Sequence, residues 1–131
     1  WIGGLLGFPD LTLQWILGVL FAPFALLMGI PWSEAVQVGS LLGVKTVLNE
    51  FLAFRDLGAL MEAEALSPRS IVIASYALCG FANFSSIGIQ IGGISAVAPR
   101  RKTELAQLGL RAMFGGAIAS WLTATIAGML L

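Results

Sequence analysis

The sequence contains no histidine and a single cysteine, Cys79. One cysteine cannot form a disulfide within the chain. Without histidine there is no Cys/His zinc site and no base for a Ser-His-Asp triad or a Cys-His dyad. Charge is also scarce, because 11% of the 131 residues are charged and the seven basic residues balance the seven acidic ones. This balance leaves no basic surface that would indicate nucleic-acid binding.

Apolar residues take the place of the missing charge. Hydrophobic residues make up 58% of the chain and the mean hydropathy is +0.93, whereas an ordinary soluble domain is about 45 to 50% apolar and about 25% charged. We therefore expect an all-α integral membrane protein. The chain opens on Trp1 without a basic and then apolar leader, so we expect no signal peptide and an internal or C-terminal piece of a longer protein.

Two stretches are predicted to be full transmembrane helices. Residues 11–33 are free of charge, and because about 20 apolar residues cross a bilayer core, we place a span at 11–30. A final span is predicted over 103–131, where many glycines, alanines and hydroxyl residues recur. Small residues of this kind favour close helix packing over ligand contact.

Residues 33–57 differ from an ordinary span. Ser33 is a plausible helix cap, but the uncharged run 35–44 covers only about half a bilayer at 1.5 Å per residue before Lys45 interrupts it. Two half-length apolar pieces that meet at a polar tip are typical of a re-entrant helical hairpin. We therefore predict such a hairpin over 33–57, with Asn49 and Glu50 at its tip.

Glu50 is the residue on which the functional hypothesis depends. A charge in the middle of the hydrocarbon costs on the order of 2.5 to 3.5 kcal/mol, so an acid at that depth indicates a functional site. The alternative is one interfacial helix with Glu50 among the headgroups. Lys45 is equally compatible with a lysine whose ammonium group snorkels to the membrane surface without contacting a ligand.

Residues 68–98 are predicted to form a broken helix. A helix begins well at Ser67-Pro68, and a continuous helix over 70–99 would be about 45 Å long, too long for one straight span. The polar stretch 80–86 is the expected interruption, and Asn83 and Ser86, three residues apart, can face the same ligand. The alternative is that they join helices by hydrogen bonds, beside a small-residue Gly88-x-x-x-Gly92 motif.

Charges in the short loops predict the orientation. Arg100, Arg101 and Lys102 are consecutive and predict a cytoplasmic loop. Residues 55–69 contain more acidic than basic side chains, which favours the opposite side for this connection.

Several motifs together resemble the C-terminal part of the concentrative nucleoside transporter family, over nearly the whole chain. They are Gly43-x-Lys45-x-x-x-Asn49-Glu50-Phe51, then Tyr76-Ala77-Leu78-Cys79-Gly80-Phe81-Ala82-Asn83-Phe84-Ser85-Ser86-Ile87-Gly88, then Gly92-Gly93 and Ala98-Pro99-x-Arg101. The resemblance implies a cation-coupled nucleoside symporter of the plasma membrane, in bacteria the inner membrane, that works as an elevator within a homotrimer. It also implies two inverted repeats, each with a re-entrant hairpin and a broken helix.

By this resemblance the chain supplies the second repeat and the span before it, and its partners are the nucleoside, the lipid bilayer and the N-terminal half of the same transporter. The resemblance assigns Glu50, Asn83 and Ser86 to the ribose, and Asn49 to the same substrate site. It places the base-reading residues and the site of the coupling cation, Na+ or H+, in the first hairpin and its neighbouring helix. We therefore expect no cofactor or metal site in this chain.

Two other classes of protein remain as alternatives. A membrane enzyme is disfavoured because Ser85 and Ser86 have no histidine base, although Lys45 is a conceivable one. The stronger alternative is a structural membrane module that assembles with a partner subunit and transports nothing. In that case Glu50 is only a desolvation cost, and replacing it with leucine stabilises the fold.

Overall fold

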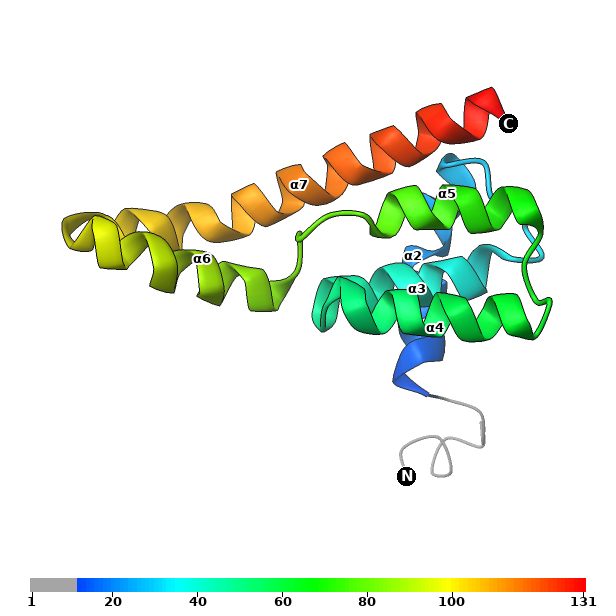
Figure 1. The fold of residues 1–131 in the computed structure, drawn as a ribbon, viewed down its shortest axis with the longest axis horizontal. Helices are drawn as coiled ribbons and strands as arrows, with labels where there is room; N and C mark the ends of the chain where they lie inside the picture. The colour runs from blue at the N-terminus through cyan, green and yellow to red at the C-terminus, as the bar shows by residue number, and fades with distance from the viewer. Residues whose placement is uncertain (1–11) are drawn as a thin grey trace.

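The computed structural model describes residues 12–131, and within this range the chain contains helices and no strand. The predicted all-α class is thereby confirmed. Figure 1 shows the order of the helices along the chain. They are α2 (Leu13–Leu27), α3 (Ala35–Val47), α4 (Glu50–Glu62), α5 (Pro68–Leu78), α6 (Phe84–Val97), the short 3-10 helix η1 (Pro99–Arg101) and α7 (Lys102–Leu130).

Four of these helices begin with a side chain that caps the first turn. Such a cap accepts a hydrogen bond from a backbone N–H that has no partner within the helix. The caps are Thr12 for α2, Asn49 for α4, Ser67 for α5 and Asn83 for α6. Polar residues in this apolar chain therefore fix where helices begin.

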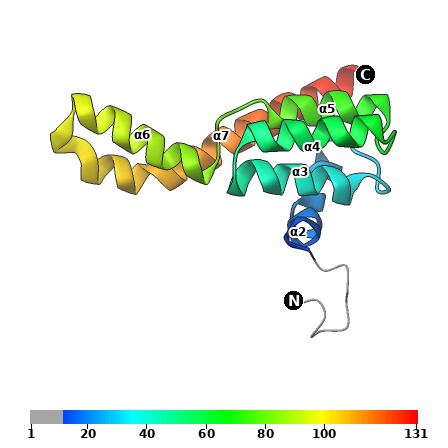
Figure 2. The same ribbon diagram turned by 60° about the horizontal axis from the view of Figure 1, so that its bottom comes forward.

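Helices α3 and α4 form a hairpin and lie side by side in two views (Figures 1 and 2). The turn between them consists of Leu48 and Asn49, and Glu50 is the first residue of α4. Helix α4 continues to Glu62, beyond residue 57, where we expected the hairpin to end. The re-entrant position of the hairpin in a membrane stays a prediction.

Helix α2 crosses α3 steeply at close range (Figure 2). Glycine makes the approach possible: a Cβ atom on Gly39 would collide with the carbonyl oxygen of Gly18 and come within 2.8 Å of the Ala22 backbone nitrogen. Helix α2 has 15 residues, so it is about 22 Å long, shorter than a bilayer core of about 30 Å. The full span predicted over 11–30 stays a prediction, and residue 11 lies outside the described residues.

Replacing Gly39 with alanine is expected to destabilise the fold by about 1 to 3 kcal/mol, because the added methyl group meets backbone atoms that have no rotamer to change. The matched control is Gly92→Ala, since a Cβ atom at Gly92 meets nothing within 4 Å. Alanine is the better helix former, so the control is expected to be neutral or stabilising by up to about 1 kcal/mol. Denaturant unfolding in detergent measures both, and equal stabilities would contradict the packing described for α2 and α3.

The long apolar segment after Ser67 is broken, as its length requires. Helix α5 ends at Leu78 and α6 begins at Phe84, so residues 79–83 form the break, slightly before the predicted stretch 80–86. The difference has a local cause, because Asn83 caps α6 and thereby starts the helix before Ser85 and Ser86. At the break, Ser120 of α7 approaches so closely that a Cβ atom on Gly80 would lie 2.5 Å from its Oγ.

Helix α7 runs beside both halves of the broken helix (Figure 1). Pro99–Leu130, which contains it, is the one helical stretch among residues 12–131 that is long and apolar enough to cross a membrane. Small residues bring it close to its neighbours, since a Cβ atom on Gly128 would lie 2.8 Å from the Met28 carbonyl oxygen. In contrast, Cβ atoms on Gly88 and Gly92 would meet nothing within 4 Å, so this motif joins no helices in the described part of the chain.

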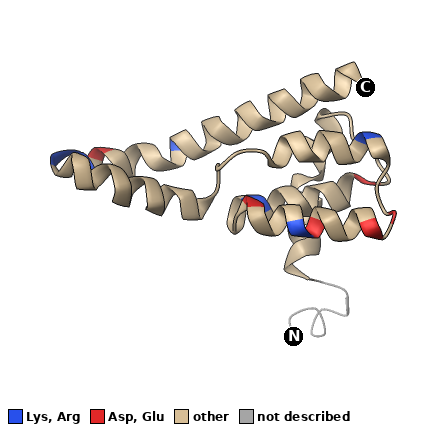
Figure 3. Ribbon diagram, in the orientation of Figure 1, with Lys and Arg blue, Asp and Glu red and all other residues tan. Residues whose placement is uncertain are grey.

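The main core lies where α3, α4 and α5 meet, with contributions from α2 and α7. Charged connections lie at the two ends of the molecule (Figure 3). The turn between α6 and α7, with Arg100, Arg101 and Lys102, is at one end of the long axis, and the connection between α4 and α5 is at the other. Within the positive turn, Glu104 accepts two hydrogen bonds from Arg101 at 2.8 Å.

Candidate substrate site between the hairpin tip and the helix break

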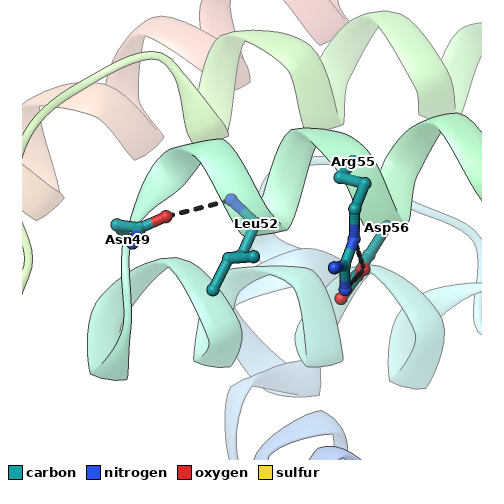
Figure 4. A network of polar contacts seen from close by, with 4 residues as sticks. All are labelled: Asn49, Leu52, Arg55 and Asp56. Atoms are coloured by element: carbon teal, nitrogen blue, oxygen red, sulfur yellow. Dashed lines mark hydrogen bonds and ion pairs between the residues drawn. The ribbon is translucent and has the colours of Figure 1, made fainter.

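The hairpin tip is fixed by a helix cap. Asn49 Oδ1 accepts a hydrogen bond from the backbone N–H of Leu52 at 3.0 Å (Figure 4). This cap places Glu50 in the first turn of α4, where the helix dipole favours a negative charge. One turn further on, Arg55 pairs with its neighbour Asp56 at 2.8 Å. The Asn49 cap thus fixes the place of Glu50 in the first turn of the helix.

A hydrogen bond joins the tip to the helix break. Asn83 Nδ2 donates to Glu50 Oε2 at 2.8 Å, and Asn83 Oδ1 accepts from the backbone N–H of Ser86 at 2.8 Å. Asn83 is only 1% exposed, so both functions of its amide are used in a buried place. The same side chain thus starts α6 and holds the Glu50 carboxylate against that helix end.

A second contact supports the first. Ser85 Oγ donates to the Leu48 carbonyl oxygen at 3.2 Å, so two hydrogen bonds join the N-terminal end of α6 to the hairpin tip. Backbone carbonyl groups in a turn have no hydrogen-bond donor from a regular helix or strand and need another partner. Here the broken helix satisfies one of them and fixes the relative position of both elements.

Ser86 lies on the other side of this junction. Together with Asn83 it lines a cavity of about 390 Å³ between α6 and α7, whose walls also include Phe81, Gln90 and Met113. Glu50 and Asn49 do not line this cavity. Of the four predicted site residues, Glu50 and Asn83 are therefore in direct contact, Ser86 follows one turn along α6, and Asn49 acts through the cap of α4.

Lys45 is the residue whose place the sequence did not reveal. It is 1% exposed, and its Nζ donates to the carbonyl oxygen of Ala77 at 2.9 Å. A snorkelling lysine has its ammonium group in water, so that interpretation is wrong for this chain. Ala77 is the last residue but one of α5, and the partner is a backbone atom, which no side-chain motif could have indicated.

The two ends of the broken helix thus meet opposite charges of the hairpin. The carbonyl end of α5 accepts from the Lys45 ammonium group, and the N-terminal end of α6 is held by Asn83 against the Glu50 carboxylate. These signs match the partial charges of helix ends, which are negative at the C-terminus and positive at the N-terminus. The junction thus fixes a carboxylate beside the start of α6.

Helices of half length whose ends turn toward a polar site are a device of secondary membrane transporters, and the broken helix and the hairpin of this chain have that arrangement. A family model described as "Na+ dependent nucleoside transporter C-terminus" matches residues 1–128. The chain belongs to this family of nucleoside transporters. The resemblance seen in the motifs and the integral membrane class are both confirmed.

Known proteins of the family are similar over nearly the whole chain. The transporter YutK of Bacillus subtilis is 48% identical over 126 residues, which cover 96% of this chain and 31% of that protein. The human sodium/nucleoside cotransporter 1 is 41% identical over 143 residues, covering 99% and 22%. A solved structure of CNTnw in an inward-facing substrate-bound state is 47% identical with a TM-score of 0.93, covering 97% and 31%. The chain thus spans about a third or less of the relatives that it matches.

Proposed function

We propose that the chain is the C-terminal part of a cation-coupled nucleoside symporter and supplies the ribose-binding part of its substrate site. The observation that supports this most directly is the 2.8 Å hydrogen bond between Asn83 and Glu50. It holds a carboxylate at the meeting point of a hairpin tip and a broken helix. The charged oxygen atoms are thereby fixed before a ligand arrives, which lowers the entropy cost of binding.

The chemistry of the ribose fits this carboxylate. An ionised carboxylate is an acceptor with about four lone-pair positions, and Asn83 uses one of them on Oε2. Vicinal hydroxyl groups present two donors side by side, and hydrogen bonds to a charged acceptor are stronger than neutral ones. Ser86, one turn along α6, adds a hydroxyl group that donates and accepts.

The remaining parts of the proposal concern the whole transporter. We propose that the N-terminal half of the same protein reads the nucleobase and binds the coupling cation, Na+ or H+, and that the complete protein works as a homotrimer in the plasma membrane, in bacteria the inner membrane. The description of the family model names Na+. In the part of this chain that the structure describes, no cluster of three or more His, Cys, Asp or Glu side chains could hold a metal ion.

Uptake by proteoliposomes that contain the complete transporter tests the proposed function. Radiolabelled uridine and adenosine are supplied separately under an inward Na+ gradient, an inward H+ gradient, or neither. We expect one of the nucleosides to accumulate under one of the gradients, and unlabelled ribonucleoside to compete with it. Absence of accumulation for both nucleosides under both gradients would contradict symport.

The orientation can be tested with two engineered cysteines in a background without other cysteines, in which Cys79 is replaced by serine. We expect Glu62→Cys to react with an impermeant maleimide added outside the cell. Lys102→Cys is expected to react only when the cytoplasmic side is opened, because the positive turn between α6 and α7 remains inside. Labelling of position 62 from the cytoplasm alone would reverse the assignment.

A further inference from the structure

Lys45 is the largest side chain among the fully buried residues, and it is charged. An ammonium group is expensive to bury and is retained only with a partner. Its partner is the Ala77 carbonyl oxygen at 2.9 Å, on a helix 32 residues further along the chain. The burial of Lys45 and its long-range hydrogen bond indicate that this side chain does more than fill the core.

The partner belongs to the open carbonyl end of α5. The last four carbonyl groups of a helix have no partner inside it. Here the backbone N–H of Cys79 donates to Ser75 at 3.1 Å and to Tyr76 at 3.2 Å, and Lys45 donates to Ala77. Lys45 is therefore a charged donor at the negative end of this half-helix, where a cation interacts favourably with the helix dipole.

Discontinuous membrane helices use this kind of end for another purpose. The carbonyl ends of half-helices and the unwound backbone beside them are where secondary transporters coordinate their Na+ or H+. A primary ammonium group has the same single positive charge as Na+, and it directs N–H groups toward carbonyl oxygen atoms. In this chain the carbonyl end of α5 already has such a cation, attached to the hairpin.

We propose that the Lys45 ammonium group is a cation supplied by the protein in place of an inorganic one at the carbonyl end of α5. Because it is covalently part of α3, it ties the hairpin to the helix break and keeps the tip where Asn83 can hold Glu50. Lys45 is then a positioning residue. Its contribution rests on a positive charge and an N–H donor at this point, and the side-chain volume alone does not replace it.

The Lys45 ammonium group also lies beside the helix break. A Cβ atom placed on Gly80 would lie 3.8 Å from Nζ, which is ordinary contact distance. Truncation of Lys45 to alanine is expected to leave a narrow cavity that ends at the Ala77 carbonyl oxygen. A small alkylammonium ion fits such a cavity by both shape and charge, whereas a methionine at position 45 fills the space and brings no donor.

The experiment compares Lys45→Ala, Lys45→Met and wild type in the complete transporter, with Lys102→Ala as a control at an exposed lysine. Each protein is titrated with methylammonium chloride, and choline chloride serves as a cation without an N–H donor. Two quantities are measured for each protein: the midpoint of thermal unfolding in detergent, and the rate of nucleoside uptake. We expect methylammonium, but not choline, to raise the thermal midpoint of Lys45→Ala and to increase the nucleoside uptake of this variant at least tenfold. Lys45→Met, Lys102→Ala and wild type are expected not to respond.

Two results would overturn the inference. One is a Lys45→Met protein with the thermal midpoint and uptake of wild type, and the other is a Lys45→Ala protein whose midpoint does not rise with methylammonium. If Lys45→Ala folds only when expressed with methylammonium, that recovery counts as rescue, and a failure to fold with methylammonium counts against it. Uptake rests on the proposed function, but the thermal midpoint does not, so the two failures can be told apart.

Discussion

Replacing Glu50 with glutamine in the complete transporter is expected to lower nucleoside uptake by about ten- to a hundredfold. Glutamine keeps the size of the side chain and one oxygen atom that can accept from Asn83. It loses the negative charge, and its NH2 group turns donors toward the donor groups of the sugar. The loss of a hydrogen bond between a partly buried charge and its partner costs roughly 1 to 3 kcal/mol, which corresponds to this range in binding.

The control for this variant is Glu62→Gln. Glu62 is the last residue of the same helix and is exposed, so the chemical change is identical but far from the tip. Initial rates over a range of nucleoside concentrations are compared at equal amounts of protein in the membrane. If both variants transport like wild type, Glu50 does not contact the substrate.

Replacing Asn83 with aspartate is expected to reduce uptake by more than a hundredfold. Aspartate still caps α6, because a carboxylate oxygen accepts from the Ser86 N–H as the amide oxygen does. The amide donor to Glu50 is lost, and two carboxylates come to lie at what was a 2.8 Å contact. Two unit charges repel by about 4 kcal/mol even at 4 Å with an effective dielectric constant of about 20.

The control for Asn83→Asp is Thr12→Asp, which places the same capping residue before α2. Thr12 is exposed, and its hydroxyl caps α2 by accepting from the backbone N–H of Trp15. This change is therefore expected to leave uptake within about twofold of wild type. Circular dichroism of both variants checks that the helices remain. Uptake by Asn83→Asp at the level of its control would show that the contact between Asn83 and Glu50 is dispensable.

The elements that local signals define could be predicted from the sequence. The half-length apolar run before Lys45 indicated the hairpin, and the Ser67-Pro68 start with a long uncharged run indicated the broken helix. The exact break was displaced because Asn83 was interpreted as a ligand contact when it is also a helix cap. An Asn followed by apolar residues is a common helix start, and this signal would have placed the beginning of α6 at Phe84.

The long-range contacts could not be predicted in the same way. Asn83 and Glu50 are 33 residues apart and Lys45 and Ala77 are 32 apart. The resemblance to the transporter family implied that Asn83 and Glu50 share a site, but it did not imply that they bond to each other. The partner of Lys45 is a carbonyl group, which every residue has, so no pattern of side chains reveals it.

Helix packing was also only partly visible in the sequence. The small-residue motif Gly88-x-x-x-Gly92 was a candidate for close packing, but a glycine that does lie against a neighbouring helix is Gly39, next to Gly18. A glycine in a helix permits close contact with a neighbouring helix without requiring it. Which glycine is used depends on the partner helix, and that is decided by the tertiary fold.

The central claim is that Glu50, Asn83 and Ser86 bind the ribose, and a cycle of paired changes in protein and substrate tests it most directly. Uptake competition is measured for wild type and for Glu50→Gln, Asn83→Ala and Ser86→Ala, each with a nucleoside and its 2′-deoxy and 3′-deoxy analogues. The deoxy analogues are predicted to lose about tenfold or more in affinity for wild type and much less for the variants, because the missing contact is already absent. Fully additive effects at all three residues would contradict the assignment and leave them as links between helices.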